Sequence, residues 1–312
     1  MMANLKELSK KPDHFTAGHR LCAGCGIPII PKLLYRVTDY DIVVTSATGC
    51  FEVATTIYPY TSWAKPFVHS AFENAAATAS GIEAMYKSLK AQGKFPADRQ
   101  VKVVAFGGDG GTYDIGLQAL SGAMERGHDF VYICYDNGAY MNTGIQRSSA
   151  TPYGAATTTS PSGEVIPGKS QPRKDLTSIA AAHHIPYAAQ TTVAHYNDLA
   201  TKLEKALKVD GPAFLNVLSP CVPGWMIPTE KSMEVTRLAV ETCYWPLFEV
   251  ENGVMKLNYK PKEKKAITEW TRTQGRFRHL SNPKNAHVIE ELQRQVDTYW
   301  EYVLRLEASH QK

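Results

Sequence analysis

The chain has 312 residues, of which 44% are hydrophobic and 21% charged, so it can bury a full core as a globular protein. Its net charge of +4 is too small to indicate nucleic-acid binding, and no basic amphipathic run supports that function. The N-terminus is polar and no apolar stretch reaches membrane-spanning length. We therefore expect a cytoplasmic protein that binds neither nucleic acid nor membranes.

The predicted elements alternate between strands and helices over most of the chain. An extended arm at 1–20 precedes strands expected at 41–50, 101–111, 129–137, 185–192 and 212–220. Helices are expected between them, at 72–92, 115–127, 175–184 and 196–208. Because a strand, a glycine turn, a helix and a strand form a right-handed parallel unit, the alternation predicts an α/β fold with a doubly wound, mostly parallel sheet.

Two later segments have different patterns. Residues 138–173 show no helical or strand period, and their Thr, Ser and Gly content favours an active-site loop over disorder. Beyond them, 244–259 predicts a β-hairpin turning at Asn252-Gly253, and 287–310 predicts a long amphipathic helix. We divide the chain into an N-terminal arm at 1–40, an α/β domain at 41–222 and a C-terminal extension at 223–312.

Cysteines in turns marked by glycine or proline form the first chemical motif. The turns read HRLCAGCGIP, SATGCFE and LSPCVPGW, and they contain Cys22, Cys25, Cys50 and Cys221. Thiolates on turns bind an iron–sulfur cluster or zinc. The third and fourth cysteines are single and far apart, which favours a [4Fe–4S] cluster over the paired Cys-x-x-Cys motifs of small zinc modules. Cys134 and Cys243 lack such turns, so we expect them to be packing residues.

A glycine-rich turn forms the second motif. GGDGGTYDIG (107–116) follows one predicted strand, and YDNGAYMNTG (135–144) follows the next, with 26 residues (111–136) between Gly-Asp-Gly and Asn137. Glycines let backbone N–H groups approach phosphate oxygens, and a helix starting near Thr112 adds its dipole. Asp109, Asn137 and a main-chain carbonyl near Ala139 can supply oxygens to Mg²⁺. The motif therefore indicates a diphosphate–Mg²⁺ site, with a glycine turn capped by Asp as the alternative.

These motifs, with YPYTSW, FENAAATASGIEA and LAVETCYWPLFEVENG, resemble the β subunit of multi-subunit pyruvate:ferredoxin oxidoreductases over nearly the whole chain. The resemblance implies thiamine diphosphate held through Mg²⁺ by Asp109, Asn137 and Ala139, with the four turn cysteines holding the cluster nearest the cofactor. It implies that Asn142 faces the substrate beside the thiazolium carbon, although Asn142 could instead only stabilise its own turn. The cofactor-binding residues are then Cys50, Gly108, Asp109, Gly110, Gly111, Asn137, Ala139, Asn142 and Thr143.

Three positions depart from the family's pattern: an acidic residue is replaced by Gly138, a proline by Val222, and the Glu of single-chain relatives by Ile27. Gly138 lies in the active-site segment, so the substrate can be pyruvate or oxalate, the dicarboxylate substrate of a close relative. His69 and Arg147 are candidate cationic partners for a substrate carboxylate. A buried satisfied His and a solvated Arg are the alternatives.

The resemblance also implies that the active site is shared. In this family a Glu from another subunit contacts the aminopyrimidine ring, and Glu52 and Glu73 here lie at the diphosphate end. We expect an α subunit that supplies the catalytic Glu, γ- and δ-type subunits, and ferredoxin as electron acceptor. A non-redox thiamine diphosphate decarboxylase or carboligase would not need the cysteines. A pure iron–sulfur electron-transfer subunit would not need the glycine turn.

Overall fold

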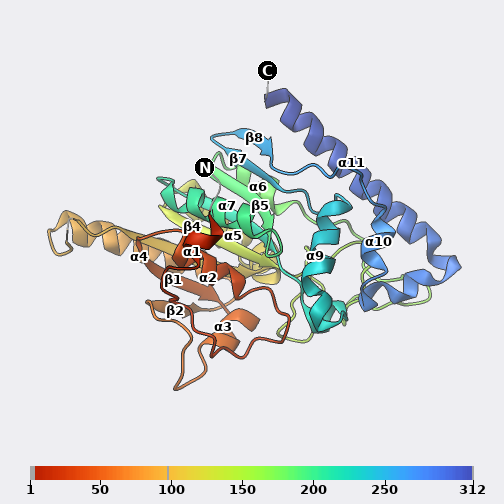
Figure 1. Cartoon of the computed structure of the whole chain (residues 1–312), viewed down its shortest axis with the longest axis horizontal. Coiled ribbons are helices and arrows are strands. Elements are labelled where there is room, and N and C mark those ends of the chain that lie inside the picture. Colours follow the sequence, from red (N-terminus) through yellow and green to blue (C-terminus); the bar gives the residue numbers. More distant parts are fainter. Residues whose placement is uncertain (1–3, 97, 311–312) are drawn as a thin grey trace.

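One eight-stranded sheet forms the centre of the computed structural model, which describes residues 4–96 and 98–310 (Figure 1). The strand order is β2-β1-β3-β4-β6-β5-β7-β8, and the first six strands in this order are parallel. This arrangement confirms the predicted doubly wound α/β fold. The parallel strands are β1 Asp41–Ala47, β2 Phe67–Ser70, β3 Val101–Gly108, β4 Phe130–Asp136, β5 Tyr187–Thr192 and β6 Ala213–Leu218.

Helices cover both faces of the sheet because successive strand residues point to opposite sides. Along β3, Val104 and Phe106 join a core with α2 (Ile29–Arg36) and α7 (Tyr196–Lys208). Val103 and Ala105 pack in a second core, on the other face, with the helices that complete the βαβ units. These are α4 Ala75–Ala91, α5 Leu117–Glu125 and α6 Leu176–Ala181.

Short elements follow the carboxyl ends of three parallel strands, so their first residues lie at one edge of the sheet. α3 (Cys50–Thr55) follows β1, a π-helix η1 (Gly110–Ile115) follows β3, and α8 (Val222–Trp225) follows β6. Residues 138–173, after β4, contain isolated β-bridges but no helix or strand, as their sequence predicts. This edge is where open α/β sheets bind ligands.

The N-terminal arm is more structured than expected. It contains α1 (Leu5–Leu8), and its fully buried Phe15 forms a β-bridge with Trp63. α2, within the predicted arm, was also not expected. Both helices are short, and tertiary contacts rather than local pattern stabilise such elements.

The predicted hairpin is present and extends the main sheet. Its strands, β7 (Phe248–Glu251) and β8 (Val254–Leu257), turn at Asn252 and Gly253, which have φ of 50° and 81°. β7 pairs antiparallel with β5, so part of the predicted C-terminal extension belongs to the sheet. The division at residues 40 and 222 stays a prediction. The remaining elements are η2 Thr229–Lys231, α9 Ser232–Glu241, α10 Ile267–Thr271, η3 Gly275–Ser281, η4 Pro283–Asn285 and α11 Ala286–His310.

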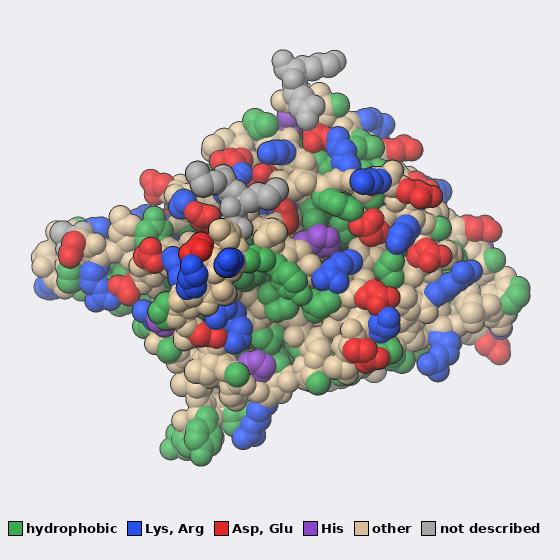
Figure 2. Space-filling view, in the orientation of Figure 1, with side chains coloured by type: hydrophobic (Ala, Val, Ile, Leu, Met, Phe, Trp, Pro, Cys, Tyr) green, Lys and Arg blue, Asp and Glu red, His purple; other side chains and the backbone are tan. Residues whose placement is uncertain are grey.

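The surface mixes charges of both signs. Figure 2 shows acidic and basic side chains interspersed over one face, with hydrophobic side chains gathered on a projection. The segment between α3 and β2 projects from the body in Figure 1, and it includes Tyr58 and Tyr60, which are 93% and 73% exposed. Among the described helices, none is both long and apolar enough to cross a membrane.

Candidate functional site

Three oxygen atoms meet where β3 and β4 end, and we call Asp109, Asn137 and Ala139 the oxygen site. The side-chain oxygen of Asn137 lies 2.9 Å from Oδ1 of Asp109 and 2.9 Å from the main-chain oxygen of Ala139. With the amide turned over, its NH₂ group would donate to both oxygens instead. The turned-over amide satisfies all three groups through hydrogen bonds alone, whereas three facing acceptors are stable only when a cation lies between them.

The carboxylate of Asp109 is buried and held in one orientation. It is 1% exposed, and it accepts hydrogen bonds from the backbone N–H of Asn137 at 3.2 Å and from Oγ of Ser148 at 2.5 Å. Burial, followed by the nearby Asp136 carboxylate, raises the pKa of Asp109 well above its usual range. Ser148 was not predicted, because it belongs to the long loop whose conformation no local pattern specifies.

A second buried carboxylate lies directly behind the oxygen site. Asp136 accepts a hydrogen bond from Oη of Tyr113 at 2.7 Å, and one of its oxygens lies 3.5 Å from the guanidinium of Arg173. Burial raises the pKa of Asp136, while Arg173 and the Tyr113 hydrogen bond oppose this rise. These partners fix the end of β4, from which Asn137 projects.

The glycine turn approaches its neighbours closely. A Cβ at Gly110 would lie 2.2 Å from the ring of Tyr140, and one at Gly111 would lie 3.1 Å from the main-chain oxygen of Phe72. The π-helix begins at Gly110, two residues before the start expected near Thr112. Tyr140, missed by the sequence analysis, therefore lies against the backbone predicted to receive the diphosphate.

One small cavity collects the predicted cofactor-binding residues. Its wall also includes Thr48, Phe72 and Tyr135. His69, a candidate carboxylate partner, adjoins this wall, since its Nε2 lies 2.9 Å from Oγ1 of Thr48, whereas Arg147 does not line the cavity. The predicted residues that line it are Cys50, Gly108, Asp109, Gly110, Gly111, Asn137, Ala139, Asn142 and Thr143. Their individual roles stay predictions.

Asn142 lies on a closed turn that Gln146 helps to stabilise. Tyr140 and Gln146 exchange backbone hydrogen bonds of 2.9 and 3.2 Å, and the Gln146 side chain bonds to both the side chain and the backbone of Thr143. Asn142 is exposed, and its side chain makes no hydrogen bond within the described part of the chain. Gln146 supplies the side-chain hydrogen bonds of this turn, and the choice between a substrate-facing and a turn-stabilising role for Asn142 stays a prediction.

A buried lysine stabilises the long loop at 138–173 through hydrogen bonds to its backbone. Lys169 is 2% exposed, and its Nζ donates to the main-chain oxygens of Thr151, Ser149 and Pro172 at 2.6, 3.2 and 3.3 Å. Burial, followed by nearby arginines, lowers its pKa to about 7. Because Ser148 adjoins this clamp, Lys169 helps to hold the serine that supports the oxygen site.

Four thiols lie near enough to act electrostatically on Cys25 or on one another, and we call Cys22, Cys25, Cys50 and Cys221 the thiol site. Burial raises the pKa of Cys25 to about 12, and the other three thiols add to the rise. Burial and the neighbouring thiols likewise raise the pKa values of Cys50 and Cys221 to about 11. Cys134 and Cys243 are fully buried within separate hydrophobic clusters, in agreement with their predicted packing role.

Close packing brings the turns of the thiol site together. A Cβ at Gly24 would lie 2.7 Å from the main-chain oxygen of Thr229, so the Cys-x-x-Cys turn packs on the segment that follows Cys221. A Cβ at Gly49, before Cys50, would lie 2.5 Å from Oη of Tyr135. Glycine allows the close approach of a backbone at Gly24 and of a tyrosine side chain at Gly49.

A hydrogen bond connects the thiol site to the oxygen site. Trp225, at the end of α8, donates from Nε1 to the main-chain oxygen of Asn137 at 2.6 Å. Cys221 is the residue immediately before α8, and its Sγ accepts from the backbone N–H of Gly224 at 3.4 Å. One four-residue helix therefore contacts both sites.

No group of three or more His, Cys, Asp or Glu side chains within residues 4–96 and 98–310 is arranged to hold one metal ion. The oxygen site has one such side chain, since its other two oxygens come from an amide and the backbone. The thiols are not grouped around a single ion, and a four-iron cluster needs wider spacing because each thiolate binds a different iron.

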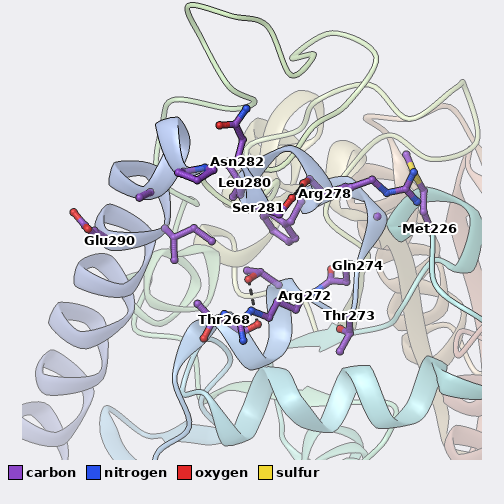
Figure 3. A pocket seen from close by; sticks show the side chains of 16 residues that line it. Met226, Thr268, Arg272, Thr273, Gln274, Arg278, Leu280, Ser281, Asn282 and Glu290 are labelled. Atoms are coloured by element: carbon purple, nitrogen blue, oxygen red, sulfur yellow. Dashed lines mark hydrogen bonds between the residues drawn. The ribbon is translucent and has the colours of Figure 1, made fainter.

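A larger cavity lies elsewhere, between α10, η3, η4 and α11 (Figure 3). It measures about 660 Å³, and Arg272, Arg278 and Glu290 are among its lining residues. None of the predicted site residues lines it. Size alone does not identify a functional site, and we assign function to the smaller cavity, where the ligand types of both motifs meet.

Comparisons with known proteins agree with this assignment. Residues 47–217 match the family described as thiamine pyrophosphate enzyme, C-terminal TPP binding domain. The chain is 55% identical to pyruvate synthase subunit PorB of Methanocaldococcus jannaschii, covering 92% of this chain and 95% of the relative. It is 52% identical to the PorB subunit of Thermotoga maritima, over 98% and 97%.

Two further relatives extend the comparison. The ketoisovalerate oxidoreductase subunit VorB of Pyrococcus furiosus is 45% identical over 94% of this chain and 93% of the relative. A solved 2-oxoglutarate:ferredoxin oxidoreductase from Magnetococcus marinus has a TM-score of 0.54 at 20% identity, covering 73% of this chain and 81% of that chain. The structural likeness supports the same fold.

Proposed function

The chain belongs to the thiamine pyrophosphate enzyme family, as a β subunit of a 2-oxoacid:ferredoxin oxidoreductase, and we propose two cofactor sites for it. It binds the diphosphate of thiamine diphosphate through Mg²⁺, and it holds a [4Fe–4S] cluster beside this cofactor. Thiamine diphosphate, when bound, supplies the carbon nucleophile and the electron sink for decarboxylation of a 2-oxoacid. The protein residues bind and orient the reactants, and the four cysteines would hold the cluster that accepts and passes on the electrons.

The spacing of the Asp109, Asn137 and Ala139 oxygens supports the Mg²⁺ proposal most directly. Mg²⁺ binds oxygen ligands at about 2.0–2.1 Å in octahedral geometry, so adjacent ligand oxygens lie about 2.9 Å apart. The 2.9 Å separations of the Asn137 amide from Asp109 and from Ala139 have the length of this edge, which is also the length of the hydrogen bonds that the turned amide donates. Ser148 and the Asn137 N–H orient the carboxylate, while phosphate oxygens and water would complete the coordination.

The donor set and electrostatics support the cluster. Besides burial, Cys22, Cys50 and Cys221 all contribute to the raised pKa of Cys25, so the four lie near one another, and Cys50 also lines the cofactor cavity. Thiols with raised pKa values stay protonated at neutral pH unless a cationic centre binds them. Iron supplies such a centre, and the separate turns fit a cluster with one thiolate on each iron.

Pyruvate is the substrate that we propose. The relatives at 55% and 52% identity are named pyruvate synthase subunits, while the ketoisovalerate relative is 45% identical. Oxalate, kept open by Gly138, has no such support. His69 is the better placed carboxylate partner because it adjoins the cavity through Thr48.

A partner subunit is needed to complete the proposed site. No Glu lines the small cavity among the described residues, which supports an α subunit as the source of the catalytic Glu. The relatives are themselves named as subunits. We propose γ- and δ-type subunits as further members of the complex, ferredoxin as the acceptor, and the cytoplasm as its location.

The test uses the complete complex. We expect thiamine, iron and acid-labile sulfide in the wild type, and ferredoxin reduction with pyruvate but not with oxalate. Cys22→Ser should lose a visible cluster absorption band that Cys243→Ser, a matched change of a packing cysteine, retains. Stoichiometric zinc, or equal spectra for the two variants, would contradict the cluster proposal.

A further inference from the structure

A guanidinium is buried beside the oxygen site, where the charges of Asp136, Cys221 and Asp109 act on it although no carboxylate of the described residues lies within ion-pair distance. Arg276, in η3, is 2% exposed. Its Nε donates to Oε1 of Gln274 at 2.8 Å, and it forms no ion pair within 4.0 Å with any Asp or Glu of the described residues. A buried cation is unfavourable unless a negative group compensates for it.

Aromatic rings hold this guanidinium in place. Its carbon lies 4.2 Å from the ring centroid of Trp225, 5.2 Å from that of Phe277 and 5.5 Å from that of Trp270. Trp225 is the residue at the end of α8 that donates to the main chain of Asn137. The cation–π stack therefore fixes the charge against the helix that contacts both sites.

The far end of the guanidinium faces the backbone between two proposed Mg²⁺ ligands. A Cβ at Gly138 would lie 2.9 Å from Nη1 of Arg276, so the glycine leaves this nitrogen in close approach to the chain. Burial lowers the pKa of Arg276 to about 10, which keeps it charged at neutral pH. Trp225, on which the guanidinium stacks, donates its backbone N–H to the main-chain oxygen of Cys221 at 2.8 Å, so the cation lies within one helical turn of that cysteine.

We propose that the buried cation of Arg276, held close to Cys221, stabilises the bound iron–sulfur cluster. The same positive charge raises the reduction potential at which the cluster accepts an electron. The inference rests on the proposed cluster. Reduction adds one negative charge to a centre that already carries four thiolates, and a nearby buried cation favours the more negative state. Arg276 adds no chemical step, since the electron comes from the 2-oxoacid and leaves to ferredoxin.

The experiment is a redox titration of the complete complex with dithionite, followed by electron paramagnetic resonance. The signal of this cluster is identified as the one missing in Cys22→Ser. We expect Arg276→Gln and Arg276→Met to lower the reduced-to-oxidised ratio at the wild-type midpoint about tenfold, which for one electron corresponds to about 59 mV. Arg276→Lys should retain most of the wild-type ratio.

The matched control is Arg278→Gln. Arg278 lies on the same η3 segment but is exposed and lines the separate cavity of Figure 3. Its replacement should leave the ratio unchanged. Loss of the cluster in both neutral variants but not in Arg276→Lys would also support charge compensation.

Two results would overturn the inference alone. One is an unchanged ratio in the neutral variants with the cluster intact. The other is loss of the cluster in all three Arg276 variants, lysine included, which would show a packing role. A wild-type complex without iron and sulfide would instead overturn the proposed cluster, and this inference with it.

Discussion

The oxygen site and the thiol site share one edge of the sheet, yet the chain holds them in different ways. Asp109 and Asn137 follow adjacent, hydrogen-bonded strands and are 1% and 5% exposed. The thiols come from three separate turns, and Cys22 is exposed. The sheet therefore fixes the first site directly, while the second depends on packing between segments far apart in sequence.

Because of this difference, substitutions at the two sites should affect activity and folding stability to different extents. The ligands of the oxygen site form part of a buried hydrogen-bond network, so changes there can disturb the loop and the strand ends together. A cysteine on an exposed turn contributes little to folding in the absence of a cluster. The two sites are compared best by substitutions that change either activity or folding stability, but not both.

The largest effect is expected at the exposed end of the thiol site. Cys22→Ser should abolish ferredoxin reduction by removing a cluster ligand, while the unfolding free energy of the cluster-free chain changes by less than about 0.5 kcal/mol, as for other exposed positions. Iron analysis and denaturant unfolding measure the two properties. A loss of several kcal/mol in the cluster-free chain would show that the turn is structural.

The second largest effect concerns Asn142, which lines the same cavity as the oxygen site. Asn142→Ala should lower turnover by about 100- to 1,000-fold, because removing one preorganised donor to a changing charge has this cost. Steady-state kinetics of the reconstituted complex measure it, with the cluster spectrum as a control for assembly. Near-normal turnover would remove Asn142 from the catalytic residues.

A smaller effect tests how the oxygen site is supported. Ser148→Ala should weaken Mg²⁺-dependent thiamine diphosphate binding by about 10- to 100-fold, the usual consequence of losing a hydrogen bond to a ligating carboxylate. Ser149→Ala is the matched control, because Ser149 bonds to Asp114 instead. Calorimetric titration of both variants decides the point, and equal losses would assign the effect to the loop as a whole.

The last prediction concerns the pH dependence of stability, where no effect on the proposed ligands is expected. The pKa of Lys169 is about 7 in the folded chain and 10.5 without burial, so its contribution to stability is complete above about pH 10.5 and declines as the pH falls towards 7. The unfolding free energy of wild type relative to Lys169→Met should therefore rise between about pH 7 and 10. Lys10→Met, at an exposed ion pair, should show no such trend. A flat difference for Lys169 would mean that its three carbonyls keep the amine charged.

The sequence predicts the strands well because strands depend on local pattern, whereas the ligand assignments stay predictions. The apolar runs before Gly107 and Asn137 predict buried parallel strands, and strand ends on one edge bring Asp109 and Asn137 together. The residues that support the sites were missed. Ser148, Tyr140 and Arg276 reach them through a long loop or a distant 3₁₀ segment, where tertiary packing and not periodicity sets the conformation.

The spread of the thiols along the chain also sets an order of assembly. Cys22 and Cys25 leave the ribosome early, whereas Cys221 follows β6, the last parallel strand to be made. N-terminal segments fold first during synthesis, so the turn that carries the first two thiols has no fourth partner until nearly three quarters of the chain exists. Insertion of the proposed cluster would therefore be a late event in biogenesis, acting on parallel strands that have already been made, with the exposed Cys22 as its accessible point of entry.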